Sequence, residues 1–132
     1  MVIDTSAVLA VLMNEPERHR FNELIAADPK RLISAASLVE SAIVIESRYG
    51  EAGGRELDLY IHRAGIEMAP VDAEQAELAR AAWRRYGKGR HPAGLNYGDC
   101  FSHALSVWSG EPLLYKGDDF TRTDIRSADP QR

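Results

Sequence analysis

The chain has 132 residues, the length of one ordinary domain, and its 45% hydrophobic and 27% charged residues exclude a disordered protein. Its net charge of −4 gives no bulk sign of a nucleic-acid-binding protein. Cys100 is the only cysteine, which excludes an intrachain disulfide and favours a reducing compartment. The first predicted strand begins at residue 2, so we expect no signal peptide, and the longest early uncharged run, residues 5–14, is half the roughly 20 residues that a membrane helix needs. We therefore expect one soluble cytoplasmic domain over residues 1–132, with no membrane association.

Short apolar segments alternate with longer helical ones along the chain. In chain order, the pattern predicts strand 2–3, helices 6–13 and 17–27, strand 31–34, helices 36–49 and 55–64, strand 66–71, helices 73–86 and 96–109, strand 112–116 and a short strand 125–127. Gly50, Gly53 and Gly54 are expected to separate helix 36–49 from the next helix. Strands that alternate with helices predict an α/β protein with a central parallel sheet of four to five short strands.

Acidic side chains stand at comparable positions in this pattern. Asp4 ends the first strand, and Glu40 lies one to two helical turns past the second. Asp99 opens the last long helix, and Asp118-Asp119 follow the fourth strand. Because parallel sheets bind ligands at the carboxyl ends of their strands, these carboxylates are candidates for one site. Clustered carboxylates repel one another, and the usual compensation is a hard divalent cation, Mg²⁺ or Mn²⁺, which suits phosphodiester chemistry.

Each acid also has an ordinary structural explanation. Asp4 could cap the helix that follows it, and Asp99 is spaced from Asn96 as in a capping box. Asp118-Asp119 could be an acidic turn. Glu40 is the most telling, because its helix is apolar nearly all round and is expected to be buried. The individual signals are weak, and the joint pattern is stronger than any one of them.

The basic segment 84–91 concentrates cations with no acid among them. Its members are Arg84, Arg85, Lys88, Arg90 and His91. They could hold the backbone of an RNA, and a solvated loop explains them about as well. Thr5 or Ser6 could bind phosphate or orient Asp4.

The four acidic segments together resemble a known family, the PIN-domain ribonucleases, and within it the VapC toxins of bacterial toxin–antitoxin pairs. The matching segments are Met-Val-Ile-Asp4-Thr-Ser-Ala, Ser37-Leu-Val-Glu40, Asn96-Tyr-Gly-Asp99-Cys and Leu-Leu-Tyr-Lys-Gly-Asp118-Asp119-Phe120. They occur in order and span nearly the whole chain. Any one segment is a weak match, and the four together are specific.

This resemblance implies a fold, an activity and partners. The fold would be a three-layer α/β/α sandwich, and the activity that of a Mg²⁺-dependent endoribonuclease neutralised by a cognate VapB antitoxin. A homodimer with the cleft beside its interface would also follow. Asp4, Glu40 and Asp99 map onto the catalytic and metal-binding acids of the family. The fourth acid is Asp119 by the family's register, with Asp118 as a shifted substitute.

Two functions of other classes use the same residues. A metal-dependent phosphatase or phosphotransferase could act on a small molecule, although the segment after Asp4 lacks the second aspartate of the common aspartyl-nucleophile pattern. A catalytically inactive PIN scaffold could bind RNA or protein, although the retention of all the acids argues against it. Digestion of RNA with and without EDTA separates the three.

Overall fold

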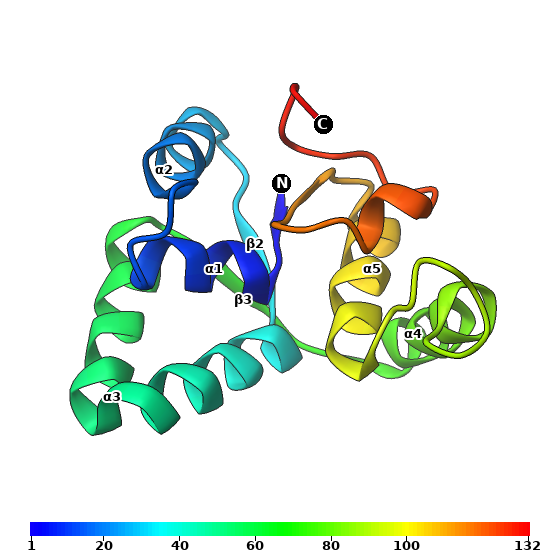
Figure 1. Cartoon of the computed structure of the whole chain (residues 1–132), viewed down its shortest axis with the longest axis horizontal. Coiled ribbons are helices and arrows are strands. Elements are labelled where there is room, and N and C mark those ends of the chain that lie inside the picture. Colours follow the sequence, from blue (N-terminus) through cyan, green and yellow to red (C-terminus); the bar gives the residue numbers. More distant parts are fainter.

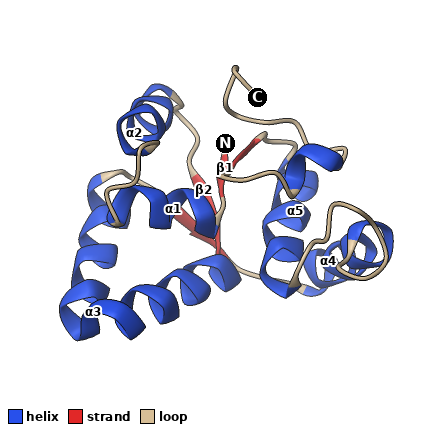
Figure 2. Ribbon diagram, in the orientation of Figure 1, coloured by secondary structure: helices blue, strands red, loops and turns tan.

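Four short strands form one parallel sheet at the centre of the molecule (Figure 2). The computed structural model describes residues 1–132. Its strands are β1 (Val2–Ile3), β2 (Leu32–Ser34), β3 (Glu67–Ala69) and β4 (Leu113–Leu114), in the order β3-β2-β1-β4. The predicted parallel sheet is confirmed. The predicted strand at 125–127 is reduced to a single parallel bridge between Leu113 and Ser127.

The strands divide their side chains between two cores. On β1, Val2 belongs to one buried cluster and Ile3 to the other, and β4 does the same with Leu113 and Leu114. Successive side chains of a strand point to opposite faces of a sheet, so a strand buried on both faces needs consecutive apolar residues. Both faces must then be covered by helices, which gives the predicted three layers.

The helices are shared between the two faces (Figure 1). On the side of Ile3 lie α1 (Thr5–Leu12), α2 (Arg18–Ala27) and α3 (Ala35–Arg63). On the side of Val2 lie α4 (Ala73–Tyr86) and α5 (Tyr97–Ser109). A 3₁₀ turn over Phe120–Arg122 follows β4. None of the helices combines the length and the hydrophobicity that crossing a bilayer demands.

Helix α3 is one kinked helix where two separate helices were predicted. Gly50 has a φ of 64° and a ψ of −158°, so the predicted break occurs there, but the helix resumes at once. Gly53 and Gly54 are helical, contrary to the prediction. A methyl group on Gly53 would lie 2.9 Å from the carbonyl oxygen of Ile45. Gly53 therefore allows the two arms of α3 to approach closely, and it does not end a helix.

The first arm of α3 is less buried than its apolar sequence predicted. Val39 and Ile43 are 59% and 61% exposed. They are four residues apart and so share one stripe of the helix surface, while Ser37, Ser41 and Ile45 face the core. An exposed apolar stripe of this kind is typical of an interaction surface.

Candidate active site

Asp4 lies at the carboxyl end of β1, where α1 begins. Its Oδ2 accepts hydrogen bonds from the N–H of Ser6 at 3.0 Å and from the hydroxyl of Ser6 at 2.6 Å, so the predicted capping role is confirmed. Its Oδ1 accepts a hydrogen bond from the hydroxyl of Ser102, on α5, at 2.5 Å. Only 4% of Asp4 is exposed. Capping explains the position of this carboxylate, but it leaves a buried acid with no cation beside it.

Glu40 extends from α3 to the start of α5. A methyl group on Gly98 would lie 2.3 Å from Oε2 and 2.6 Å from Oε1 of Glu40, so the carboxylate rests directly against this glycine. Gly98 immediately precedes Asp99. The close approach therefore brings the carboxylates of Glu40 and Asp99 into one region, and it depends on the absence of a side chain at position 98.

Asp99 is both a helix cap and a member of an acid cluster. Its Oδ2 accepts from the N–H of Asn96 at 3.0 Å, and its own N–H donates to Asn96 Oδ1 at 2.9 Å, so the predicted capping box is confirmed. The pKa of the Asp99 carboxyl is raised from its usual 3.8 to about 7, chiefly by burial. The hydrogen bond from Asn96 opposes the rise, and the charges of Asp4, Asp119 and Glu40 add to it. Asp99 is therefore a half-buried carboxyl close to three others.

The two adjacent acids after β4 have different surroundings. Asp119 is one of the charges that raise the pKa of Asp99. The side chain of Asp118 is 87% exposed, and its Oδ1 lies 3.4 Å from the guanidinium of Arg132. Asp119 therefore joins the acid cluster, which we define as Asp4, Glu40, Asp99 and Asp119, and Asp118 pairs with the C-terminal residue instead.

The acid cluster has the composition of a site for a hard divalent cation. It offers only carboxylate oxygens, the ligands that Mg²⁺ and Mn²⁺ prefer. None of its four members forms an ion pair with a lysine, arginine or histidine. Lys116, which follows β4, is held instead by Glu15 and Glu17. The negative charge of the cluster is thus left for a ligand to neutralise.

The four carboxylates are gathered without forming a finished coordination shell. No three acidic, histidine or cysteine side chains surround one point at metal-binding distances. Asp4 is fixed by three hydrogen bonds, whereas Asp119 is exposed and Glu40 is half-buried. Closing the shell around an ion therefore requires side-chain rotation of the freer acids toward Asp4.

Thr5 and Ser6 are engaged within the protein. The Ser6 hydroxyl donates to Asp4 and accepts from the N–H of Lys116 at 2.9 Å, which ties the end of β4 to the end of β1. Thr5 is buried, and its hydroxyl donates to the carbonyl oxygen of Ser37 at 3.1 Å. Of the two roles predicted for this pair, orienting Asp4 fits Ser6. The predicted phosphate contact does not fit, because both hydroxyl protons are already used inside the protein.

The basic segment 84–91 runs from the last turn of α4 into the loop that precedes α5. Arg84, Lys88 and Arg90 are exposed and form no ion pair, whereas Arg85 lies 3.5 Å from Asp124. The guanidinium of Arg90 sits 4.7 Å from the ring centroid of Trp83.

His91 turns away from this exposed group. Its Nδ1 accepts from the N–H of Ala93 at 3.0 Å, and its ring packs edge-on against Tyr86. Three of the five predicted RNA contacts, Arg84, Lys88 and Arg90, are therefore cations with no acidic partner.

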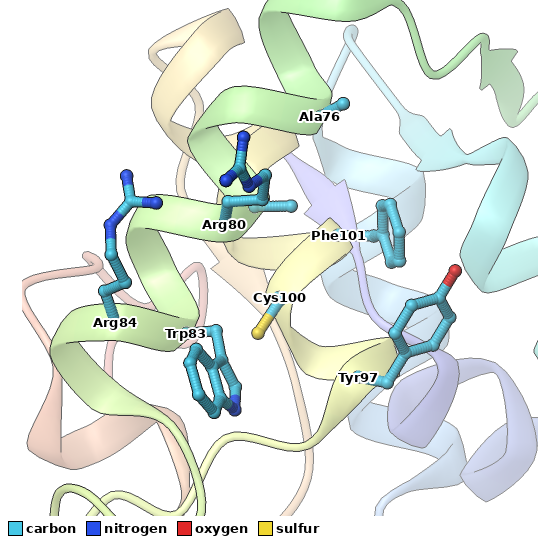
Figure 3. Close-up of a pocket in the computed structure, with 8 residues that line it drawn as sticks. Ala76, Arg80, Trp83, Arg84, Tyr97, Cys100 and Phe101 are labelled. Atoms are coloured by element: carbon cyan, nitrogen blue, oxygen red, sulfur yellow. The ribbon is translucent and has the colours of Figure 1, made fainter.

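A cavity of about 590 Å³ opens between α4 and α5 (Figure 3). Trp83 comes to it from α4, and Tyr97 and Phe101 come to it from α5. Tyr97 is 80% exposed. The wall contains none of the acid cluster, although it includes Tyr97 and Cys100, which flank Gly98 and Asp99 in the sequence. This is an apolar surface beside the acids and not the chemical centre itself.

Two buried serines near Asp4 were not among the predicted site residues. Ser102 contacts Asp4 directly, and Ser37 contacts Ser102. Their only signal in the sequence is spacing, because each lies three residues from an acid, Glu40 or Asp99, within a helix. Spacing along two separate helices does not reveal that the serines meet.

A cluster of carboxylates at the carboxyl edge of a parallel α/β sheet is typical of proteins that bind a hard cation. Residues 1–126 match the PIN domain. Ribonuclease VapC30 of Mycobacterium tuberculosis is 61% identical over 125 residues, which make up 95% of this chain and 95% of that protein. The chain belongs to the PIN-domain family, and its sequence groups it with the VapC ribonucleases.

Solved structures share the fold. VapC20 of Mycobacterium tuberculosis, a sarcin–ricin loop cleaving toxin, aligns with a TM-score of 0.75 at 18% identity, over 94% of this chain and 95% of that one. VapBC2 from Rickettsia felis, bound to a DNA fragment from its promoter, aligns with a TM-score of 0.71 at 15% identity, over 96% and 94%. The predicted PIN-like three-layer fold is confirmed.

Proposed function

We propose that the acid cluster binds Mg²⁺, or Mn²⁺, and that the chain uses it to hydrolyse RNA as the endoribonuclease toxin of a toxin–antitoxin pair. The observation that carries this proposal is a group of four carboxylates with no cationic partner, one of which has its pKa raised to about 7. Protonation or a bound cation relieves the repulsion within such a group. Because the chain is similar to the VapC ribonucleases, we assign RNA as the substrate of this chemistry.

Each member of the cluster contributes differently. Asp4 is the fixed point, because three hydrogen bonds hold its carboxylate. Asp99 is held at the first turn of α5 by its capping box, and Glu40 reaches it over Gly98. Asp119 stands at the solvent side, where an RNA phosphate would arrive. A divalent cation held by these oxygens would activate water and offset charge on the phosphate.

The exposed cations of the basic segment would hold the RNA backbone. Arg84, Lys88 and Arg90 carry charge that no acid in the chain neutralises, so they are free to replace counterions along the phosphates. Arg90 and Trp83 together present a flat cation on an aromatic ring, a surface on which an unstacked base can rest. This arrangement favours single-stranded RNA. The proposed place of action is the cytoplasm.

The remaining partners are an antitoxin and a second copy of the chain. An antitoxin of the VapB type would supply the inhibition that a toxin needs, and an arginine from it could occupy the acid cluster by bidentate pairing with carboxylates. For the homodimer, the exposed apolar side chains of Val39 and Ile43 on α3 and of Tyr97 on α5 are the candidate contacts, since Val39 precedes Glu40 and Tyr97 precedes Gly98 in the sequence. A twofold contact there would bury these side chains and bring two clefts together.

A labelled RNA separates the proposed function from its alternatives. Cleavage in Mg²⁺ that stops with EDTA and returns with added Mg²⁺ or Mn²⁺ supports the endoribonuclease. Binding without cleavage in Mg²⁺ indicates the inactive scaffold. Phosphate release from small phosphomonoesters with no effect on RNA indicates the phosphatase. Cleavage of RNA that persists in EDTA contradicts the assignment of the acid cluster.

A further inference from the structure

A chain of buried hydroxyl groups ends at the acid cluster. Ser37 on α3 and Ser102 on α5 lie with their Oγ atoms 3.1 Å apart, and they are 1% and 0% exposed. Burying a hydroxyl costs free energy unless it is hydrogen-bonded, and an alanine would fill either position without that cost. Two hydroxyls in a fully buried helix contact therefore call for an explanation beyond packing.

The direction of these hydrogen bonds is fixed by their last acceptor. Ser102 lies 2.5 Å from Oδ1 of Asp4, and an ionised carboxylate can only accept, so Ser102 donates its single proton there. Ser37 must then donate to Ser102. The carbonyl oxygen of Ser37 accepts in turn from the hydroxyls of Thr5 at 3.1 Å and Ser41 at 2.8 Å. The hydroxyls of Ser37 and Ser102 are thus both oriented toward Asp4, while Thr5 and Ser41 hold the backbone carbonyl of Ser37 in place.

The hydrogen bonds leave Asp4 with a single free acceptor position. A carboxylate oxygen offers two lone pairs. Both lone pairs of Oδ2 are used by the N–H and the hydroxyl of Ser6. One lone pair of Oδ1 is used by Ser102, which leaves one on the same oxygen. Any cation held by Asp4 in this arrangement must therefore bind Oδ1, the atom that Ser102 orients.

We propose that Ser102, supported by Ser37, is a positioning residue that aims Oδ1 of Asp4 at the bound cation. This inference rests on the proposed function, in which the acid cluster holds Mg²⁺ or Mn²⁺. The serine pair also links the helices that carry Glu40 and Asp99, because each serine lies three residues from one of these acids. Loss of the Ser102 hydroxyl removes the only hydrogen bond to Oδ1 and leaves Asp4 held through Oδ2 alone. Outer hydrogen-bonding partners of this kind typically change metal affinity by about 10- to 100-fold.

The test compares Ser102→Ala with a matched control. Ser106 lies one turn further along α5, is 4% exposed, and donates its hydroxyl to the carbonyl oxygen of Glu111, away from the acids. The dissociation constant of Mn²⁺ is measured by calorimetry on each folded protein, together with its urea-unfolding midpoint. We expect Ser102→Ala to bind Mn²⁺ about 10- to 100-fold more weakly. Ser106→Ala should lower the unfolding midpoint comparably and bind Mn²⁺ as the wild type does.

A second variant, Ser37→Ala, tests the same positioning role if Ser102→Ala does not fold. Ser37→Ala leaves the hydrogen bond between Ser102 and Asp4 but removes its support, so we expect a measurable loss of Mn²⁺ affinity that is smaller than the loss in Ser102→Ala. Unchanged Mn²⁺ affinity in a folded Ser102→Ala, or in Ser37→Ala if only that variant folds, overturns the inference, as does a wild-type chain that binds no Mn²⁺. RNA cleavage by the wild type is scored separately. A chain with serine-dependent Mn²⁺ binding but no cleavage refutes the proposed function alone.

Discussion

The raised pKa of Asp99 predicts that this member of the acid cluster destabilises the metal-free protein at neutral pH. Its folded-state pKa of about 7 lies above the usual 3.8. Between these values the folded chain binds more protons than the unfolded chain, so the free energy of unfolding falls as the pH rises and levels off above about 7. The shift of roughly three units corresponds to about 4 kcal/mol at most, and to about 2 kcal/mol after screening by the solvent that reaches this half-buried side chain.

Asp99→Asn should remove this penalty while keeping the helix cap. The amide oxygen of asparagine can still accept the N–H of Asn96 that Asp99 accepts at 3.0 Å. In EDTA, the variant should be about 2 kcal/mol more stable than the wild type at pH 8 and nearly equal to it at pH 4. Urea unfolding followed by circular dichroism measures this difference across the range. Added Mg²⁺ at pH 8 should stabilise the wild type and leave the variant unchanged.

Asp72→Asn is the matched control for this experiment. Asp72 is the N-cap residue of α4 and accepts a hydrogen bond from the N–H of Gln75 at 2.9 Å. It is thus also a carboxylate at a helix start, but it is exposed and is not among the charges that act on Asp99. Its substitution should change stability by an amount that does not grow between pH 4 and pH 8. Stability curves of Asp99→Asn and wild type that run parallel over this range would refute the electrostatic reasoning.

Three further variants test the surroundings of the cluster. Gly98→Ala should keep or slightly raise stability, by up to about 1 kcal/mol, because alanine favours a helix. It should nevertheless reduce RNA cleavage, because the added methyl group displaces the carboxylate of Glu40. The control Gly54→Ala crowds Glu46, which lies outside the acid cluster, and should cleave RNA normally. Arg84→Glu should weaken RNA binding and lower the slope of log affinity against log salt concentration by about one, the change expected for one lost phosphate contact. An unchanged slope would show that Arg84 does not contact the RNA. Ile43→Glu should convert a dimer to a monomer in light scattering, and a dimer that persists would place the interface elsewhere.

Local signals in the sequence predicted the start and the end of α5 correctly. The capping box of Asn96 and Asp99 involves residues three apart, and Gly110 ends the same helix with a left-handed φ of 74°. Such features depend on the neighbouring backbone alone, so tertiary structure does not alter them. The break at Gly50 was also predicted correctly, because it too depends on the local backbone. Gly53 was misread because its role is a contact with Ile45 on the preceding arm of α3, which a break pattern does not encode.

Features that depend on distant contacts could not be predicted in this way. The hydrogen bond between Ser102 and Asp4 joins residues 98 positions apart. The apolar pattern of α3 predicted a buried helix, and this prediction was wrong for Val39 and Ile43, which are exposed. The same pattern of residues suits a buried helix and an interface helix, because both exclude water in the assembled protein.

Direct titration with Mn²⁺ tests whether the acid cluster binds a divalent cation. Calorimetric titration at pH 7 should show saturable binding to the wild-type chain. Binding should be lost in the double variant Asp4→Asn/Asp99→Asn, which retains the capping acceptors of both helices. Equal binding by the two proteins would contradict the account, because the cation would then lie outside the cluster.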